Sequence, residues 1–399
     1  MRKKRNDLEM IAVAYLRSQN NDQHVIAERL KISQSHVSRL IADAKKEGIL
    51  EETIRFVSDQ LPQEKLERAK ARLHVEPLED RIAALSPGRR PSLHIYPCHG
   101  RNTSAATWRH RIERFSGDCA NDLLKVLASA SIIGVAWGVM IASAVEAMQK
   151  MQTGRRVPGR SKQTIIPLLG EPLGRPITQH SSSVLASKLA EILDPNPDSK
   201  PGITTLSLAP VPAFIPADFS RAETSAIRKL IRRITLYQEI FGAGDEKVSD
   251  SKGKSLPLIE RVDAILTSVS SEERPLGFDD DGLIRAADIR RKRLNELVIG
   301  DLCGVVIPRS SLDRQAKTEI KRIMAQWTGV RLDHLEACAT RARNGSNSGP
   351  AGVIVLAIGA NKASVVHEAL RRGLIQHLFM DEDLADKLGE ICAPSANNS

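Results

Sequence analysis

Residues 23–50, QHVIAERLKISQSHVSRLIADAKKEGIL, have the pattern of two amphipathic helices joined by a very short connection. In the first helix, apolar residues recur at helical spacing, and Asn21 or Asp22 precedes them as a candidate N-cap. These apolar residues are Val25, Ile26 and Leu30. Lys31 and Ile32 then form the connection, which is short enough to hold the two helices against each other.

The second helix of this stretch follows Ser33, a residue type that commonly caps helix N-termini. Its inward stripe is apolar at helical spacing and consists of Val37, Leu40, Ile41 and Ala44. Its outward face carries short or forked hydrogen-bonding side chains: Gln34, Ser35, His36, Ser38 and Arg39. Such side chains reach base edges and phosphates when a helix lies in the major groove, and Ser33 lies beside them. The pattern therefore predicts a helix-turn-helix that binds duplex DNA through these residues.

Flanking residues favour this interpretation over an ordinary helical hairpin, which the same spacing also fits. A preceding helix carries an apolar stripe that supplies the third member of a helix-turn-helix core: Met10, Ile11, Ala14 and Tyr15. Gly48 is typical of a helix end, and residues 49–57 (ILEETIRFV) predict a strand of the kind that forms a wing. We therefore expect a winged helix-turn-helix domain over residues 1–58.

The whole chain is basic. Its 399 residues suffice for two or three domains, and a net charge of +10 with a pI near 9.4 suits a polyanionic partner. Residues 1–60 contribute little of this excess, because they hold 11 Lys or Arg against 9 Asp or Glu. The cluster RKKR at residues 2–5 fits either a basic arm that follows phosphates or a solubilising terminus. The helix pattern thus remains the main argument for DNA binding.

The five cysteines, at positions 98, 119, 303, 338 and 392, are odd in number, widely spaced and without a C-x-x-C pair. They favour a reduced, cytoplasmic protein without a zinc site, and no signal-peptide pattern opens the chain. Residues 126–145 carry no charge over a length near that of a membrane span, but serine and glycine dilute their hydrophobicity. We interpret them as a strand, a loop and a helix, and expect no membrane segment.

The rest of the chain alternates between short apolar runs and amphipathic helices, the pattern of a mainly parallel α/β sheet with helices on both faces. Ile132–Ala136 (IIGVA) predicts a buried strand, Trp137 and Gly138 the turn, and Val139–Met148 the following helix. Further strands are expected at residues 163–169, 204–209, 262–269, 352–358 and 374–379, and further helices at 181–193, 225–233 and 363–370.

Between these two regions, residues 62–85 are charged and periodic, which predicts linker helices, and Pro87–Pro91 (PGRRP) interrupts any helix. We therefore divide the chain into a DNA-binding domain at 1–58, linker helices at 59–91 and a second domain at 92–399. The polar, glycine-rich residues 242–255 are expected to form an exposed surface loop.

Four segments, in this order, resemble the SorC family of sugar-responsive bacterial transcriptional regulators, within the broader DeoR-like group. They are HVSRLIADAKKEGIL at 36–50, IIGVAWG at 132–138, VIGDLCG at 298–304 and AIGANKASVVHEALRRGLIQHLFMDEDLADKL at 357–388. The resemblance implies an N-terminal winged helix-turn-helix and a Rossmann-like effector domain similar to ribose-phosphate isomerases and glucosamine-phosphate deaminases. It also implies that a phosphorylated sugar binds the effector domain and alters operator affinity and oligomeric state.

The effector site is expected beyond the carboxyl ends of the strands, where helix N-termini favour anions, and Gly138 occupies one such position. By resemblance, Lys362 matches a family lysine and is expected to pair with a phosphate. Asn361 and Asp301 are expected to hydrogen-bond sugar hydroxyls. The alternatives are a helix cap for Asn361, a solvated Lys362, and a structural cap or ion pair for Asp301.

The same site departs from the family in three places. Val139 and Met140 stand where the family presents Thr or Ser to a phosphate, and Ser181 and Ser183 stand where it has Gln and Asn. Residues 268–270 (SVS) replace family glycines. The effector therefore either differs from that of the family or is no longer bound, with the domain kept for assembly.

Two classes of function compete. One is a DNA-binding regulator whose C-terminal domain senses a small, phosphorylated sugar and drives homo-oligomerisation, as a dimer or tetramer, on a palindromic operator. The other is an isomerase- or deaminase-like enzyme with an added DNA-binding module, which needs a carboxylate or histidine base over the sugar carbon. No matching constellation is visible in the sequence. The histidines that cluster along the chain, His94, His99 and His110, lie in a region that the family does not use for chemistry. We therefore predict a regulator without catalytic residues, metal or cofactor.

Overall fold

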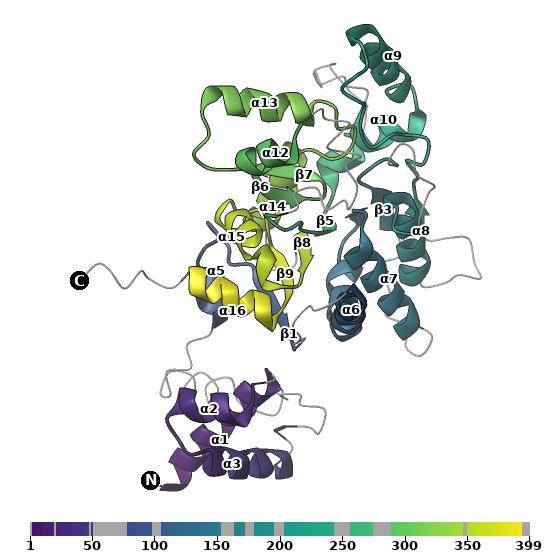
Figure 1. Cartoon of the computed structure of the whole chain (residues 1–399). Coiled ribbons are helices and arrows are strands. Elements are labelled where there is room, and N and C mark those ends of the chain that lie inside the picture. Colours follow the sequence, from purple (N-terminus) through teal and green to yellow (C-terminus); the bar gives the residue numbers. More distant parts are fainter. Residues whose placement is uncertain are drawn as a thin grey trace. The chain divides into compact units, whose positions relative to one another are not determined.

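The computed structural model describes residues 2–19, 21–47, 49–50, 78–97, 105–152, 163–171, 179–194, 203–242, 256–273, 289–345 and 349–392. Contacts divide the chain into two compact units. The first is Met1–Ile82 with Ile95–Pro97, and the second is Ala83–His94 with Cys98–Ser399. Figure 1 shows a group of helices in the first unit and a sheet flanked by helices in the second.

Three helices make up the described part of residues 1–50: α1 (Arg2–Ser18), α2 (Gln23–Leu30) and α3 (Gln34–Lys46). Lys31 turns the chain between α2 and α3 in the left-handed conformation, with φ at 54°, and its N–H donates to the carbonyls of Ala27 and Glu28. Ser33 then caps α3, because its hydroxyl accepts a hydrogen bond from the His36 N–H. The predicted helix-turn-helix connection and its serine cap are therefore confirmed.

The core of these helices contains the predicted α3 stripe and part of the predicted α1 stripe, but Ala12, Val13 and Leu16 also belong to it and one α2 residue was misplaced. The α3 stripe is fully inside, and α1 contributes Met10, Ala14 and partly buried Tyr15 to the same cluster. Val25, however, is 45% exposed, and the inward residues of α2 are Ile26, Ala27 and Leu30. At about 100° per residue, positions 26, 27 and 30 fall within about 100° of the helix circumference, whereas position 25 lies about 140° from position 30. The narrower face with Ile26, Ala27 and Leu30 therefore packs on the core, and Val25 lies at its margin.

The cap of α2 also differs from expectation. Asp22 occupies the N-cap position, but its side chain makes no capping hydrogen bond. Asn21 instead donates through Nδ2 to the Leu16 carbonyl at 2.9 Å, so it ties the end of α1 to the connection. The predicted wing at 49–57 and the linker helices at 59–91 lie largely outside the described residues, apart from α5 (Leu78–Ala83).

The second unit contains a seven-stranded sheet in the order β1-β9-β8-β5-β2-β3-β4. Its strands are β1 (Ser92–Tyr96), β2 (Ile132–Val135), β3 (Gln163–Pro167), β4 (Ile203–Thr205), β5 (Ala264–Ser268), β8 (Gly352–Ala357) and β9 (His377–Asp381). The pairs from β9 through β4 are all parallel, which confirms the mainly parallel sheet. β8 is buried at every position, as expected for a strand covered on both faces.

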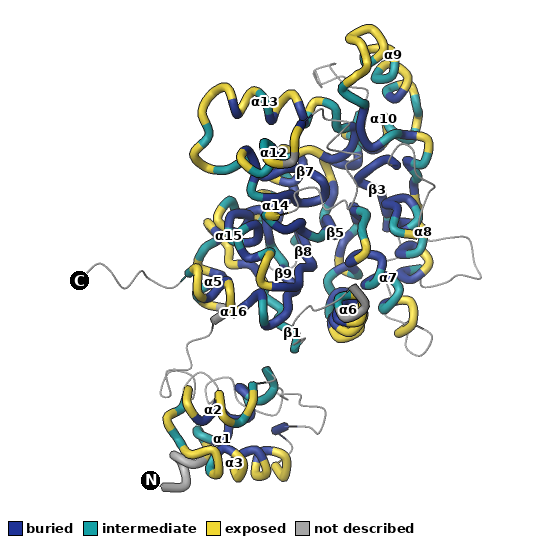
Figure 2. Tube along the Cα trace, viewed as in Figure 1, coloured by how far each residue is buried: buried dark blue, intermediate teal, exposed yellow. Residues whose placement is uncertain are grey.

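Helices that follow the strands cover the sheet (Figures 1 and 2). They include α6 (Ala105–Ala128), α7 (Val139–Gln152), α8 (Ser182–Leu193), α14 (Leu332–Asn344), α15 (Ala363–Arg371) and α16 (Glu382–Ile391). Within the uncharged residues 126–145, the predicted strand, loop and helix are confirmed as β2, the loop after it and the start of α7, while residues 126–128 are the end of α6, which was not predicted. Within the described residues, no helix combines the length and the apolar character that crossing a bilayer requires.

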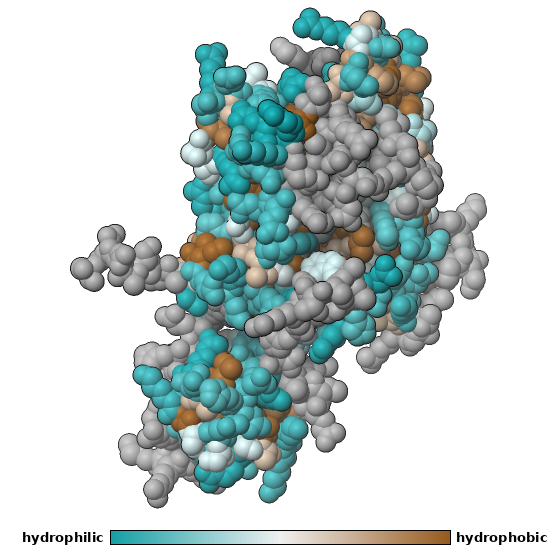
Figure 3. Space-filling view, viewed as in Figure 1, coloured by the Kyte–Doolittle hydropathy of each residue, from teal (hydrophilic) through white to brown (hydrophobic). Residues whose placement is uncertain are grey.

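Several elements of the second unit were not predicted. One of them is a hairpin of β6 (Val298–Leu302) and β7 (Val305–Pro308). Its two-residue loop places both Cys303 and Gly304 at positive φ. The others are β1, α6, α14, α16 and the helices α10 (Thr235–Phe241), α12 (Arg291–Leu297) and α13 (Arg314–Met324). The hairpin, α12 and α13 share a separate apolar cluster with Trp137 and Trp327. Figure 3 shows a mainly hydrophilic outer surface where α12 and α13 lie in Figure 1.

Some predicted bounds also shift. The helix expected at 225–233 is α9 (Arg221–Ile231), which begins earlier because Ser220 and Glu223 form a capping box. Strand β4 is shorter than the predicted 204–209, and β9 begins at His377, after the residues at 374–376. Short 3-10 helices η2 (Leu258–Arg261) and η3 (Ala360–Lys362) complete the described elements. Residues 243–255 of the predicted loop lie outside the described residues.

The strand order creates a switch point at the centre of the sheet. From β2 the chain proceeds through β3 to β4 on one side, and it then returns to β5, β8 and β9 on the other. Loops after β2 and β5 therefore leave the sheet in opposite directions. In open α/β sheets ligands bind beyond the carboxyl ends of the strands at this point.

Candidate functional site

The first candidate site is the outward face of α3. Five of the six predicted DNA-contacting residues are exposed: Ser33, Gln34, Ser35, Ser38 and Arg39. Ser33 and Ser35 also hydrogen-bond each other through their hydroxyls at 3.1 Å. Because Gln34, Ser35, Ser38 and Arg39 recur at helical spacing, they form one polar ridge on the helix.

The sixth residue, His36, is placed differently from the other five. Its Nε2 lies 3.1 Å from Oε2 of Glu9 on α1, and both side chains are partly buried. His36 therefore joins α3 to α1, a contact between helices that sequence spacing alone did not indicate. Sequence reasoning had also left out Lys45 and Lys46, which are exposed in the last turn of the same helix.

The second candidate site is the carboxyl edge of the sheet. The predicted effector residues follow strands of the main sheet, with one exception: Gly138 comes after β2, Ser181 and Ser183 are at the start of α8, and Asn361 and Lys362 are in η3 after β8, whereas Asp301 lies within β6 of the two-stranded hairpin. The structure brings them together as two groups, one around Lys362 and one around Ser181. Gly138 lies near the second group, because its N–H donates to the carbonyl of His180, the residue before Ser181.

Lys362 is the cation of the first group. Burial lowers the pKa of its ammonium group to about 8, while the carboxylates of Asp301 and Asp381 oppose this shift. The group therefore still carries its proton at neutral pH in most molecules. No hydrogen bond joins it to another described residue, so it remains available to an anion. Asn361, the neighbouring predicted contact, is exposed.

Asp301 has a structural role as well as its position near Lys362. Its side chain is buried, and Oδ1 accepts a hydrogen bond from the Gly304 N–H at 3.0 Å, which closes the β6–β7 turn. Its own N–H donates to the Ser270 hydroxyl at 2.9 Å. Asp301 thus joins the hairpin to the end of β5. This is a structural role of the kind that the sequence analysis gave as the alternative to sugar binding.

A buried ion pair stabilises the loop that carries Lys362. Asp381, at the end of β9, accepts hydrogen bonds from the N–H groups of Gly359 and Leu384, each at 3.0 Å. Arg111 of α6 pairs with both Asp381 and Asp383. Burial raises the pKa of Asp381, and the hydrogen bonds and Arg111 lower it, so burial outweighs its partners. Sequence reasoning missed this pair because its members lie far apart in the chain.

The second group of predicted residues, Ser181 and Ser183, forms hydrogen bonds within the protein. The Ser181 hydroxyl caps α8 by accepting from the Val184 N–H, and the Ser183 hydroxyl accepts from the Leu208 N–H at 3.0 Å. Both hydroxyls also hydrogen-bond Glu171, whose pKa is raised by burial and lowered by these two bonds. Oε1 of Glu171 is buried without a hydrogen-bond partner among the described residues. Glu171 was not predicted, although its place just after a buried strand was a usable signal.

The backbone of Gly138 also forms a hydrogen bond within the protein. Its φ is 122°, a conformation that favours glycine, and its N–H donates to the His180 carbonyl at 3.1 Å. The next side chains are those of exposed Val139 and buried Met140, neither of which donates a hydrogen bond. The start of α7 therefore offers an anion fewer donors than the resemblance implied.

The histidines considered for an enzyme do not form a constellation. His94 stacks on Phe379 with ring centroids 4.1 Å apart, and burial lowers its pKa. His110 is exposed on α6, 3.9 Å from a carboxylate oxygen of Glu113. His99 lies outside the described residues.

Solved structures of bacterial regulators share this fold. The full-length sorbitol operon regulator SorC from Klebsiella pneumoniae aligns over 96% of this chain and 99% of its own, with a TM-score of 0.52 and 17% identity. A DeoR family transcriptional regulator from Listeria monocytogenes aligns over 78% and 98%, with a TM-score of 0.50 and 19% identity. A domain proposed to bind sugar, from a Vibrio fischeri transcriptional repressor, aligns over 79% and 98%, with a TM-score of 0.51 and 14% identity.

No protein-family model and no curated protein sequence matches the chain. The structural neighbours are thus SorC- and DeoR-type regulators, the group that the four sequence segments indicated. At these identities the likeness establishes the fold that the proteins share.

Proposed function

We propose that this chain is a SorC-type transcriptional regulator that binds operator DNA through α3 and a sugar-class effector at the carboxyl edge of its sheet. The observation that carries the proposal is the polar ridge of α3, which stands exposed on a packed three-helix core. The fold likeness to a full-length regulator over 96% of the chain supports it. The wing at 49–57 and the domain limits at 58 and 91 are part of this proposal.

On DNA, we propose that the regulator acts as a homo-oligomer with two α3 helices in successive major grooves. Such grooves lie about 34 Å apart, so the operator should be close to palindromic. The effector then controls DNA binding only if it prefers one assembly or domain arrangement, because equal affinity for both would shift nothing.

At the effector edge, the phosphate of a sugar phosphate would pair with Lys362, and Asn361 and Asp301 would face its hydroxyls. A degenerate pocket is the second candidate, and a specific observation favours it. Ser181, Ser183 and the Gly138 N–H are already bonded within the protein, and Val139 supplies no donor. In that case the domain would serve assembly alone.

Arg39→Ala is expected to weaken binding to a site selected from random duplex DNA. The loss of binding free energy should be about 1–3 kcal/mol, on the order of 5- to 150-fold in affinity, if the guanidinium makes a bidentate contact with a guanine. Gel-shift titration measures the change. Arg39→Lys separates the two kinds of contact, because lysine keeps the charge for a phosphate but lacks the fork. Unchanged affinity in Arg39→Ala would remove this residue from the interface.

Lys362→Ala is expected to abolish stabilisation by the effector in a thermal-shift screen of sugar phosphates and free sugars. A ligand present at about 100 times its Kd stabilises the native state by about 2.7 kcal/mol, and loss of the Lys362 cation removes its charge-assisted hydrogen bond to the phosphate. Lys317→Ala, an exposed lysine of α13, is the matched control. Stabilisation that survives in Lys362→Ala would contradict the assigned contact, and a screen without any hit would favour the degenerate pocket.

A further inference from the structure

A short part of the second unit holds a concentration of basic residues. Residues 290–322, which include α12, the β6–β7 hairpin and most of α13, hold nine Lys or Arg against four Asp or Glu. Their net charge of +5 is half of the +10 of the whole chain. Residues 1–60, which contain the proposed DNA-reading helix, contribute only +2. The basic excess of this protein therefore lies mainly outside the helix-turn-helix.

The helix α13 is amphipathic and packs on the protein through one side. It buries Ala316, Ile320 and Ile323 in the apolar cluster that it shares with α12. At about 100° per residue, these three positions lie within about 60° of one another, so only one side of the helix faces the protein. Figure 2 shows exposed residues along the rest of α13. We call its exposed basic residues the basic face of α13: Arg314, Lys317, Lys321 and Arg322.

The carboxylates of α12 and α13 are already bound to other groups. Glu319 accepts from Nε and Nη2 of Arg293 at 3.1 and 2.8 Å, which joins α13 to α12, and Glu296 accepts from Nη1 of the same arginine at 3.2 Å. Asp313 caps α13 by accepting from the Ala316 N–H at 2.7 Å. Among the described residues, no side-chain hydrogen bond or ion pair engages the basic face of α13. Its positive charge is therefore available to a partner.

The stability of α13 does not explain where these charges stand. Lys321 and Arg322 lie in the last turn, where the helix dipole favours cations. Arg314, however, is the first residue of the helix, where the dipole disfavours a cation. Arg314 and Lys321 lie on the same side of the helix, because seven residues make almost two whole turns. A face that stays basic even where this destabilises the helix fits a role in binding.

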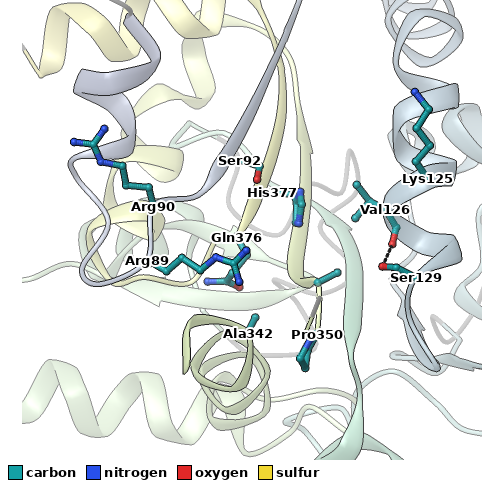
Figure 4. Close-up of a pocket in the computed structure, with 12 residues that line it drawn as sticks. Arg89, Arg90, Ser92, Lys125, Val126, Ser129, Ala342, Pro350, Gln376 and His377 are labelled. Atoms are coloured by element: carbon teal, nitrogen blue, oxygen red, sulfur yellow. Dashed lines mark hydrogen bonds between the residues drawn. The ribbon is translucent and has the colours of Figure 1, made fainter. Parts of the chain in front are cut away.

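A second group of basic residues is not free in this way. Arg89, Arg90 and Lys125 line a hollow of about 330 Å³ near the amino ends of β1 and β9 (Figure 4). Lys125 pairs with Asp122 at 2.9 Å, and both arginines interact with other residues of the protein. The basic face of α13 is thus the stronger candidate for contact with a polyanion.

We propose that the basic face of α13 binds the phosphate backbone of duplex DNA, as a contact additional to that of α3. Duplex DNA is the polyanion that the proposed function, on which this inference rests, brings to the protein. Arg314, Lys321 and Arg322 are the contacts, since arginine pairs with phosphate in a bidentate manner and lysine pairs as a point charge.

The dimensions of the two partners agree. From Arg314 to Lys321 the helix rises about 10 Å, and one DNA strand carries a charge about every 3.4 Å of its axis, so these cations can face neighbouring phosphates. Phosphate contacts add affinity and fix orientation but carry no sequence information. In this arrangement α3 selects the sequence and α13 strengthens binding.

The test uses the full chain in the Arg39→Ala background and a duplex of random sequence, so that base reading by Arg39 does not contribute. Fluorescence anisotropy gives the binding constant at several salt concentrations. Each phosphate contact contributes about −0.9 to the slope of log Kobs against log salt concentration. Arg314→Gln/Lys321→Gln/Arg322→Gln is therefore expected to reduce the slope by about 2–3 and to weaken binding about tenfold or more at low salt.

The matched control, Arg109→Gln/Lys188→Gln/Arg261→Gln, lowers the net charge equally at positions on α6, α8 and η2. It should keep the parent slope. Glutamine is a good helix former, so both triple variants should keep the parent midpoint in urea, followed by tryptophan fluorescence. Arg314→Gln alone, expected to reduce the slope by about 1, provides the same test with one change.

Either of two results overturns the proposal: a slope unchanged by the α13 substitutions, or an equal loss of binding in both triple variants. Displacement of the duplex by poly-glutamate at equal charge concentration also overturns it, and it would indicate an acidic protein as the partner. The role of α3 is tested separately by Arg39→Ala on its selected site, so its failure is distinguishable from that of α13.

Discussion

Leu40→Ala is expected to unfold the helices of residues 1–50 and to abolish DNA binding with them. Leu40 is 1% exposed, and its side chain lies in the cluster that joins α1, α2 and α3. Truncation of a buried leucine to alanine costs about 2–5 kcal/mol, a large part of the stability of a small domain. Hydrogen exchange of peptides from α3 measures the loss, since global unfolding removes protection from the whole helix.

Arg39→Ala is the control, because Arg39 precedes Leu40 on the same helix but is exposed. It should leave the exchange protection of α3 unchanged and still weaken DNA binding. Leu40→Ala should lose both. If Leu40→Ala kept full protection, the three-helix core described above would be wrong. If both variants lost protection equally, the loss of DNA binding in Arg39→Ala would say nothing about contact with bases.

The helix-turn-helix was predictable because its determinants are local. The stripe of α3 and its cap at Ser33 depend on spacing within a few turns, and spacing is visible in one sequence. Val25 was misplaced because an eight-residue helix offers too few apolar positions to fix which face is buried. The contact of His36 with Glu9 crosses from α3 to α1, and no local pattern reveals such a contact.

The parallel strands were predictable for a related reason, since buried strands such as β8 are continuous apolar runs. The β6–β7 hairpin was missed because its turn lies within the sequence DLCG, where Cys303 adopts a positive φ that cysteine rarely takes. A Cβ at Gly304 would collide with the ring of Trp327, a constraint that only the tertiary structure shows.

The candidate effector site shows the same limit more clearly. Its backbone positions followed from the resemblance and from the rule that ligands bind at the carboxyl edge. The sequence did not show which of these groups are free to bind a ligand. In the structure Ser181, Ser183 and the Gly138 N–H form hydrogen bonds within the protein, with partners that are distant or unexpected in sequence. Glu171 entered the site only when the structure placed its carboxyl against the two serine hydroxyls.

Asp381→Ala is expected to destabilise the second unit by about 3–5 kcal/mol, because it removes one partner of a buried ion pair. Asp381 is fully buried and Arg111 is 6% exposed. The substitution also leaves the N–H groups of Gly359 and Leu384 without their acceptor. All three tryptophans lie in this unit, so tryptophan fluorescence during urea unfolding follows it alone.

Asp383→Ala supplies the comparison, because Asp383 also pairs with Arg111 but its side chain is 37% exposed. Because Asp383 is partly exposed, water can solvate Arg111 and the site after the change, so this variant should unfold closer to the parent midpoint than Asp381→Ala. Asp381→Asn keeps an oxygen for the two N–H groups and should fall between the two alanine variants. Equal midpoints for Asp381→Ala and Asp383→Ala would mean that Asp381 does not support the loop. The loop that carries Lys362 begins at Gly359, whose N–H is held by Asp381. Effector affinity should therefore decline in the same order as stability, least in Asp383→Ala and most in Asp381→Ala.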